Sequence, residues 1–407
     1  MSEPSRMPIP WRPPPMPATA APRHEVPVDR CPGLVRPYAS NDGLIVRLRT
    51  GGIAVDVDIL GEIVALAREY GDGTVQLTSR GALQIRALPD PLPCRLADRI
   101  AATGIIPAPA HELVRNIIAS PLSGLDGHGH ADIRPLVTTY DELLRSRPAT
   151  SGLPGRFLVA FDDGRDDVLG EQFDLAYQAT SPTRGIVHAG DREHGREVAA
   201  DDAPTVMVDL AEAFLHARAS LDPRPWHIRE LPTPLLAPID RTPAATDPAP
   251  DGTEPAPTRR TPLGTNRTHL VVGVPLGLLT CAQYTALADV TRATGTRQVV
   301  VTPWRSIVVP EGAAHQETLA AAGLAVDQNS PWARLAACTG APGCARADMD
   351  TQTFTRRLAD ELDGPGPLVY VSACERRCGA PAENHIDLLR PATVEEALTR
   401  PGVGPRG

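Results

Sequence analysis

Hydrophobic positions in the first half of the chain follow a two-residue period, then a helical period, then a two-residue period again. Residues 43–57, GLIVRLRTGGIAVDV, predict two strands. Residues 58–71, DILGEIVALAREYG, have the apolar spacing of an amphipathic helix, and residues 74–88, TVQLTSRGALQIRAL, predict a strand, a turn and a second strand. These elements together predict a small α+β module.

The same order of elements returns in the second half. Residues 269–277 predict a strand, residues 279–295 a helix, and residues 296–310 a strand, a turn and a strand. When Thr78 is aligned with Thr302, VQLTSRGALQI lies over VVVTPWRSIVV. We interpret this as an internal duplication that yields two similar modules related by pseudo-twofold symmetry. The alternative is two unrelated α+β units that share a common order of elements.

Composition limits the class of protein. With 407 residues, a hydrophobic fraction of 42% and a charged fraction of 22%, the chain is typical of a soluble globular protein with two or three domains. It has no apolar run near the ~18–20 residues that span a membrane and no signal-peptide core at its N-terminus, so we expect a cytoplasmic protein with no membrane partner. The net charge of −9 and the aromatic fraction of 4% argue against nucleic acid as a partner.

Four of the seven cysteines are concentrated in one short segment. Cys338 and Cys344 enclose the small-residue loop TGAPG. Cys374 and Cys378 enclose ERR and follow PLVYVSA, which predicts a buried strand, while the segment between the two pairs has helical spacing. We therefore predict that two loops at the ends of neighbouring elements each present two thiolates.

Three interpretations of this cysteine pattern compete. Structural zinc sites favour two residues between the ligands of each pair, and neither pair here has that spacing. Four unrelated buried cysteines are a second interpretation, although the TGAPG loop is not a core-helix pattern. Four thiolates around a [4Fe–4S] cluster fit the ligand count and the preference of iron–sulfur clusters for soft ligands.

The C-x5-C and C-x3-C pairs, separated by a long gap, resemble the cluster motif of the sulfite and nitrite reductase family. LTSRGALQIRAL, VRNIIASPLSG and SGLPGRF resemble three further segments of that family, so that the similarity covers most of residues 40–230 and 263–390. The resemblance implies an α+β fold with a duplicated nitrite/sulfite reductase-like architecture, in which two ferredoxin-like half-domains and two α/β lobes surround a central tetrapyrrole and iron–sulfur site. With the Pro-rich segments, the expected organisation is a disordered N-terminus (1–30), a first half-domain (40–105), a first lobe (111–230), a linker (231–262), a second half-domain (263–325) and a cluster-binding lobe (330–400).

The resemblance also implies roles for individual residues. The four cysteines Cys338, Cys344, Cys374 and Cys378 would hold a [4Fe–4S] cluster. The candidates for contact with a tetrapyrrole are Arg47, Arg49, Arg80, Arg115, Asn116, Arg156 and Arg305. Two of these candidates, Arg47 and Arg49, alternate along one predicted strand and have a second interpretation as a solvent-facing pair. We predict that Arg80 and Arg305 lie on equivalent turns of the two modules.

Particular departures and matches indicate which branch of the family the chain resembles. Leu158 stands where sulfite reductases have a second lysine, which argues against six-electron reduction of sulfite because a cation is missing. Arg377 stands where a glycine is usual. VVVTPWRSIVVP and DGLIVRLRTGG resemble the branch that acts on a tetrapyrrole substrate in aerobic cobalamin biosynthesis. That resemblance implies hydroxylation of precorrin-3A at a ring-bridging carbon, with lactone formation, from dioxygen and reducing equivalents, and precorrin carboxylates suit arginine forks.

Smaller signals give further expectations. No G-x-G-x-x-G follows a strand, so we expect electrons to come from a separate ferredoxin or flavoprotein reductase. His128 and His130 in GLDGHGHAD could bind a mononuclear iron, or they could belong to a solvated Gly–His loop. The sequence identifies no catalytic residue. The alternative functions are a sirohaem-dependent nitrite or sulfite reductase, and a non-catalytic tetrapyrrole-binding or redox-sensing protein on the same scaffold.

Overall fold

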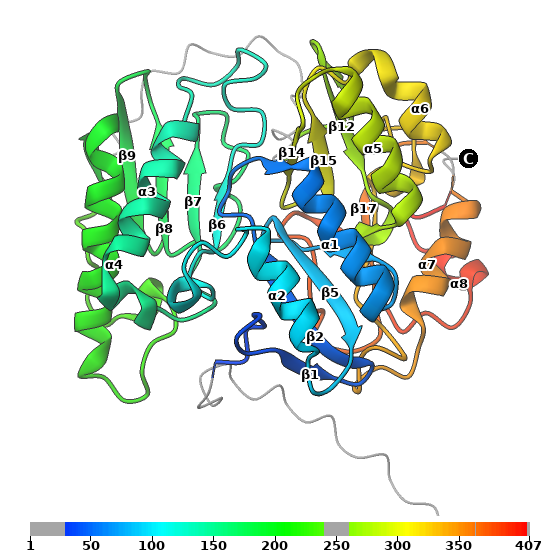
Figure 1. Ribbon diagram of the computed structural model, residues 1–407, viewed down its shortest axis with the longest axis horizontal. Helices are drawn as coiled ribbons and strands as arrows, with labels where there is room; N and C mark the ends of the chain where they lie inside the picture. Colours follow the sequence, from blue (N-terminus) through cyan, green and yellow to red (C-terminus); the bar gives the residue numbers. More distant parts are fainter. Residues whose placement is uncertain (1–28, 240–259, 363, 405–407) are drawn as a thin grey trace, which may run out of the picture.

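The computed structural model describes residues 29–239, 260–362 and 364–404. The predicted disorder of the N-terminus and the central part of the predicted linker fall outside the described residues. The described chain forms three five-stranded sheets and one three-stranded sheet. One five-stranded sheet belongs to a separate lobe, and the other two lie in the middle of the molecule (Figure 1).

The first ferredoxin-like half-domain is an antiparallel sheet covered by helices on one side. Its own strands lie in the order β1-β2-β5-β4. Their bounds are Tyr38–Ser40 (β1), Gly43–Arg49 (β2), Val75–Leu77 (β4) and Ala82–Leu88 (β5). The helices are Val57–Tyr70 (α1) and Cys94–Ala102 (α2). The side chain of Asp56 accepts a hydrogen bond from the Asp58 amide and so caps the N-terminus of α1.

The second half-domain repeats this arrangement. Its own strands lie in the order β11-β12-β15-β14. Their bounds are Gly264–Asn266 (β11), His269–Gly273 (β12), Gln298–Val301 (β14) and Ser306–Val309 (β15). The helices are Cys281–Ala293 (α5) and Gln316–Ala321 (α6). Thr280 and Gln283 form a capping box at the start of α5, which explains why the helix begins there.

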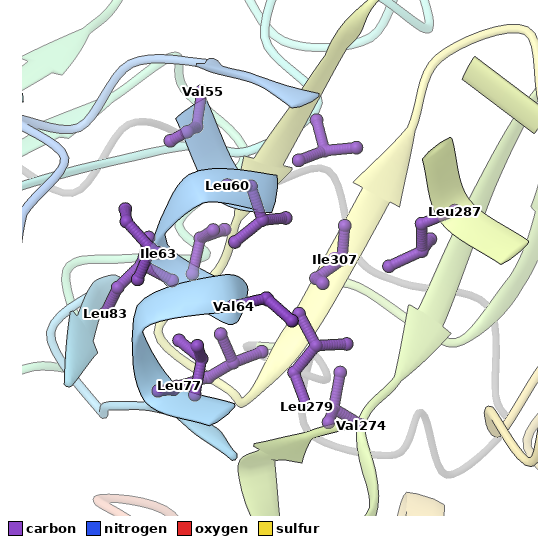
Figure 2. Packing of buried hydrophobic residues seen from close by; sticks show 14 of the residues in the cluster. Val55, Leu60, Ile63, Val64, Leu77, Leu83, Val274, Leu279, Leu287 and Ile307 are labelled. Atoms are coloured by element: carbon purple, nitrogen blue, oxygen red, sulfur yellow. The ribbon is translucent and has the colours of Figure 1, made fainter. Parts of the chain in front are cut away.

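The two half-domains exchange one short strand each. Strand β3 (Val55–Asp56) of the first half pairs with β14, and β13 (Leu278–Leu279) of the second half pairs with β4. Apolar residues of both halves form a single core, and Figure 2 shows Leu60 and Val64 of α1 beside Ile307 of β15. The reciprocal exchange confirms the predicted duplication, because each module completes the sheet of the other.

The first α/β lobe lies to one side of the half-domains (Figure 1). Its sheet has the order β10-β9-β8-β7-β6, in which β6, β7 and β8 are parallel. The strands are Ile117–Ala119 (β6), Val159–Asp162 (β7), Leu175–Ala179 (β8), Arg184–Ala189 (β9) and Gly195–Ala199 (β10). The helices are Arg134–Ser146 (α3) and Ala203–Ala219 (α4). Leu231, Leu235 and Leu236, at the start of the predicted linker, pack against the core of this lobe.

The second lobe carries the cysteine pairs. Its parallel strands are Leu335–Ala337 (β16), Leu368–Ser372 (β17) and His385–Leu389 (β18). Its helices are Thr351–Asp360 (α7) and Val394–Thr399 (α8). The predicted helix between the two pairs and the predicted strand before Cys374 are thus confirmed. Among the described residues, no helix has the length and apolar character needed to cross a bilayer.

Candidate functional site

The two cysteine pairs begin at the carboxyl ends of adjacent parallel strands. Cys338 follows β16 and Cys374 follows Ala373 at the end of β17, and these two strands are hydrogen-bonded neighbours. The backbone amide of Cys338 donates to the Val371 carbonyl at 3.0 Å. Because both loops leave the same edge of the sheet, the topology brings together residues that are far apart in sequence, as we predicted for the two loops.

Local contacts hold the thiols in one environment. The amide of Ala373 donates to Sγ of Cys338 at 3.4 Å, and the Tyr370 hydroxyl donates to the carbonyl of Cys378. Burial raises the pKa of the Cys378 thiol, the Arg376 guanidinium opposes that effect, and the charges of the other three cysteines raise the pKa further. The Cys378 sulfur therefore lies within electrostatic range of the other three cysteines. A bound cation would favour their thiolate forms.

The cysteine loop is fastened to the first half-domain. Arg86 of β5 donates to the Gly343 carbonyl at 3.0 Å and forms an ion pair with Asp42 at 3.0 Å. Ser40 Oγ donates to the same carbonyl at 2.8 Å, and Asn41 donates to the Pro342 carbonyl at 2.8 Å. We define these residues as the loop clasp: Ser40, Asn41, Asp42 and Arg86. Through the clasp, the first half-domain sets the position of the TGAPG loop.

Arg377 adopts a backbone conformation that favours glycine. Its φ is +45°, which lies in the left-handed region. The guanidinium forms ion pairs with Asp387 of β18 and with Glu375, the latter at 2.9 Å. The structure therefore explains the departure at this position: the side chain turns toward β18, while the backbone keeps the turn that a glycine would make.

A group of unneutralised arginines lies on the half-domains and the first lobe. Arg49 is 3% exposed, and its Nη2 has no hydrogen-bond partner in the described part of the chain. Burial, together with the charges of Arg80 and Arg86, lowers the pKa of Arg47 to about 10. Burial and the charge of Arg47 also lower the pKa of Arg49 to about 10. Arg49 is buried and Arg47 is half-buried, which argues against the solvent-facing interpretation of the β2 pair.

The direct partners of these arginines are neutral. Arg47 donates to Oε1 of Gln84 at 3.1 Å, and Arg49 donates to Oδ1 of Asn116 at 2.7 Å. Arg80 donates to the carbonyl of Arg156 at 2.9 Å, and burial lowers the pKa of Arg80. Within residues 29–239, 260–362 and 364–404, none of Arg47, Arg49, Arg80, Arg156 and Arg305 forms an ion pair with a carboxylate. We call these five residues the free arginine group.

Arg115 differs from that group. Its guanidinium is 6% exposed and binds both carboxylate oxygens of Asp141, at 2.6 and 3.2 Å. Its Nη1 also donates to the Ile105 carbonyl at 3.2 Å. Asn116 donates to the carbonyls of Leu113 and Gly155 at 2.9 and 2.8 Å. The structure therefore gives both residues internal partners: Arg115 holds α3 against the sheet, and Asn116 positions Arg49.

Arg156 and Leu158 lie at the edge of the first lobe. The Arg156 guanidinium stacks on the Trp226 ring at 4.4 Å, while its carbonyl accepts from Arg80. Leu158 is buried in a small apolar cluster that Trp304 contacts. The Leu158 side chain belongs to the core, so this position supplies no cation.

Arg305 occupies the turn of the second half-domain that corresponds to the Arg80 turn. Its φ is +57°, and its Nη2 donates to the Gly379 carbonyl, one residue after the last cysteine, at 2.9 Å. Burial lowers the pKa of Arg305, and Tyr370 and Glu171 partly offset this effect. Arg80 and Arg305 both lower the pKa of the Glu171 carboxyl. The two equivalent turns thus approach one carboxyl group from different half-domains.

His128 and His130 lie in an exposed loop. The described residues contain no group of three His, Cys, Asp or Glu side chains placed to hold a single metal ion. Among the described residues, the structure therefore offers no set of ligands that would support a mononuclear iron at these histidines. A cubane spreads its four sulfur ligands over four iron atoms, so a wider arrangement of thiols is compatible with it.

Sequence patterns alone did not reveal the loop clasp, Glu171 or Asp167. Arg86 shares a face of β5 with Gln84, and both are buried polar residues in a strand, which is a detectable signal. Glu171 and Asp167 belong to the loop between β7 and β8, where DDGRDD suggests only a solvated acidic turn. Their surroundings depend on residues from the second half of the chain.

Comparisons with known proteins agree with this architecture. Residues 36–91 match the nitrite/sulfite reductase ferredoxin-like half domain. The structure resembles that of the NirA protein of Mycobacterium tuberculosis with a TM-score of 0.63, over 83% of this chain and 69% of that chain, at 18% identity. The fold is therefore the duplicated nitrite/sulfite reductase architecture.

The chain is also similar in sequence to two enzymes along most of its length. The chain is 28% identical over 371 residues to precorrin-3B synthase of a Sinorhizobium species, with 88% of this chain and 80% of that protein covered. It is 24% identical over 389 residues to ferredoxin–nitrite reductase of Synechococcus elongatus, with 85% and 76% covered. These relatives support an oxidoreductase of the nitrite/sulfite reductase family.

Proposed function

We propose that the protein is an iron–sulfur oxidoreductase that hydroxylates a precorrin, with precorrin-3A as substrate and precorrin-3B as product. The main support is the free arginine group. Within it, burial and neighbouring arginines lower the pKa values of Arg47, Arg49 and Arg80, and none of the three has a carboxylate partner among the described residues. Such uncompensated charges are costly, and a ligand with several carboxylates relieves this cost. A precorrin carries acetate and propionate groups around its whole rim. Similarity to a precorrin-3B synthase over most of both chains points to the same substrate.

Cys338, Cys344, Cys374 and Cys378 would hold the [4Fe–4S] cluster. Two observations support this fit. Both cysteine pairs follow strands at the same edge of a parallel sheet, and each of the other three cysteines raises the pKa of the Cys378 thiol. When bound, such a cluster supplies electrons one at a time from an external donor, for which a ferredoxin or a flavoprotein reductase is suitable. The amide of Ala373 and the Arg376 guanidinium would stabilise the negative charge on the sulfur ligands.

In this proposal, the protein residues bind and orient the tetrapyrrole. Arg80 and Arg305, on equivalent turns, would hold carboxylates on two sides of one flat ligand. Arg47 and Arg49 would bind further carboxylates, with Gln84 and Asn116 fixing their directions. The Arg305 bond to the Gly379 carbonyl would keep this ligand close to the second cysteine pair. Leu158 lowers the positive charge available to a small anion, which favours a tetrapyrrole as substrate rather than as cofactor.

A nitrite reductase is the second candidate, and the similarity to ferredoxin–nitrite reductase favours it. The deciding experiment is one turnover of the cluster-replete protein with precorrin-3A, an electron donor and isotopically labelled dioxygen. The proposal predicts a product heavier by one labelled oxygen atom and no stoichiometric sirohaem in the purified protein. Tightly bound sirohaem together with nitrite-dependent oxidation of a reduced dye, and no labelled product, would establish the nitrite reductase instead.

A further inference from the structure

A small pocket lies where the first lobe, the second half-domain and the cluster lobe meet. Three carboxylate side chains line it, Asp167 and Glu171 from the β7–β8 loop and Glu383 from the segment after the last cysteine. Trp304, next to Arg305 on the turn of the second half-domain, lines the same pocket. These carboxylates lie near buried arginines, and we ask whether they do more than neutralise the arginine charges.

Asp167 is the most buried of the three. It is 6% exposed, and its Oδ1 accepts from the Ser120 hydroxyl at 2.6 Å. Its Oδ2 is buried and has no hydrogen-bond partner among the residues that the structure describes. An ionised carboxylate with such an orphaned oxygen is costly, whereas a protonated one carries a donor that it can pass into the pocket. Burial and the charge of Asp162 raise the pKa of Asp167 well above its usual value, while Arg165 opposes them.

Glu171 lines the same pocket as this buried acid and lies within electrostatic range of Arg80 and Arg305. Its side chain lines the pocket, so the carboxyl is available to a ligand. Burial, together with the charge of Glu383, raises the pKa of Glu171 to about 7. Arg260, Arg80 and Arg305 act in the opposite direction. A carboxyl that titrates near neutral pH beside a reaction site can both give and regain a proton.

We propose that Glu171 donates protons to the oxygen that is reduced at the tetrapyrrole site, and that Asp167 returns protons to Glu171. The inference rests on the proposed function, since hydroxylation consumes protons in an enclosed site. In the balanced reaction, a substrate C–H bond, dioxygen, two electrons and two protons give a C–OH bond and water. The electrons come from the ferredoxin or flavoprotein donor, and the protons enter through the carboxyls.

The test compares Glu171→Gln, Glu171→Asp and Asp167→Asn in the full-length, cluster-replete protein. Glu142→Gln is the matched control, because Glu142 is exposed on α3. The first measurement is infrared difference spectroscopy of the resting protein between pH 6 and pH 8. A carboxyl band that titrates near neutral pH should be present in wild type and in Glu142→Gln and absent in Glu171→Gln. Iron content should be the same in all variants.

The second measurement is the single-turnover rate with precorrin-3A across pH. Glu171→Gln should be slower by about 100-fold or more, the usual contribution of a proton-transferring side chain. Its precorrin affinity should stay within about threefold of wild type, and Glu171→Asp should recover part of the rate. Asp167→Asn should slow turnover without removing the Glu171 band. A wild-type rate and pH profile in Glu171→Gln would overturn the inference.

The two measurements separate this inference from the proposed function. Absence of turnover with precorrin-3A in wild type would contradict the proposed function, and the infrared comparison would still decide the titration of Glu171. If wild type reduces nitrite instead, the same rates are compared with nitrite, whose reduction also consumes protons. Persistence of the titrating band in Glu171→Gln would overturn the assignment in either case.

Discussion

Replacement of Arg115 by alanine should destabilise the first lobe rather than weaken precorrin binding. The Arg115 and Asp141 side chains are 6% and 9% exposed and share two hydrogen bonds. Removal of one partner of a buried pair leaves the other charge uncompensated and costs about 3–5 kcal/mol. Arg145 lies 3.0 Å from Asp141 and recovers part of this loss, so we expect the lower end of that range.

The assay is hydrogen–deuterium exchange of the protected amides in α3 and β6, which reports local unfolding. At 1.4 kcal/mol per factor of ten, about 3 kcal/mol corresponds to roughly 100-fold faster exchange. Arg134→Ala is the control in the same helix, because its pair with Asp132 is largely exposed, at 53% and 40%, and should cost less than about 1 kcal/mol. Equal exchange in Arg115→Ala and Arg134→Ala, with weaker precorrin binding only in Arg115→Ala, would refute the structural assignment.

Two further predictions concern the loop clasp and Glu171. Arg86→Ala removes a buried charged donor from the Gly343 carbonyl, and such a hydrogen bond is worth about 1.5–3 kcal/mol. Iron loss to a chelator should therefore be several-fold faster than in the exposed control Arg95→Ala. Equal rates of iron loss would contradict the role of the clasp. For Glu171, the folded protein keeps a proton that the unfolded chain releases between pH 4.5 and about 7, so the free energy of unfolding falls as pH rises through this window. Glu171→Gln should therefore gain thermal stability relative to wild type at pH 8 and gain none at pH 4, and a constant difference at both pH values would contradict the shift.

The sequence predicts the modules well because each depends on local periodicity. The apolar spacing of α1 and the alternation of apolar and polar residues in β5 are properties of short segments, and the structure confirms this helix and this strand. The strand exchange could not be predicted, because β3 and β13 are two residues long and their partners belong to the other half. A pattern too short to show a period carries no signal for its pairing.

For the candidate site, the sequence predicted the position of the cysteines but not the partners of the arginines. The spacing of the cysteines was enough to place both pairs at the ends of neighbouring elements. The spacing of the arginines could not show which of them have a carboxylate partner: Arg115 meets Asp141 only after α3 packs on the sheet, whereas Arg80 meets a carbonyl. Glu171 was missed for the same reason, since its neighbours Arg260 and Arg305 come from the second half.

The most direct test of the account is anaerobic titration of precorrin-3A into the cluster-replete protein and its arginine variants. Removal of one partner of a buried guanidinium–carboxylate pair costs about 2–5 kcal/mol, which is roughly thirtyfold or more in affinity. Arg80→Ala and Arg305→Ala should each show this loss with unchanged iron content, and Arg→Lys at either position should recover only part of it because lysine lacks the fork. The exposed control Arg95→Ala should bind like wild type. Wild-type affinity in both Arg80→Ala and Arg305→Ala would contradict the claim that the free arginine group holds a tetrapyrrole.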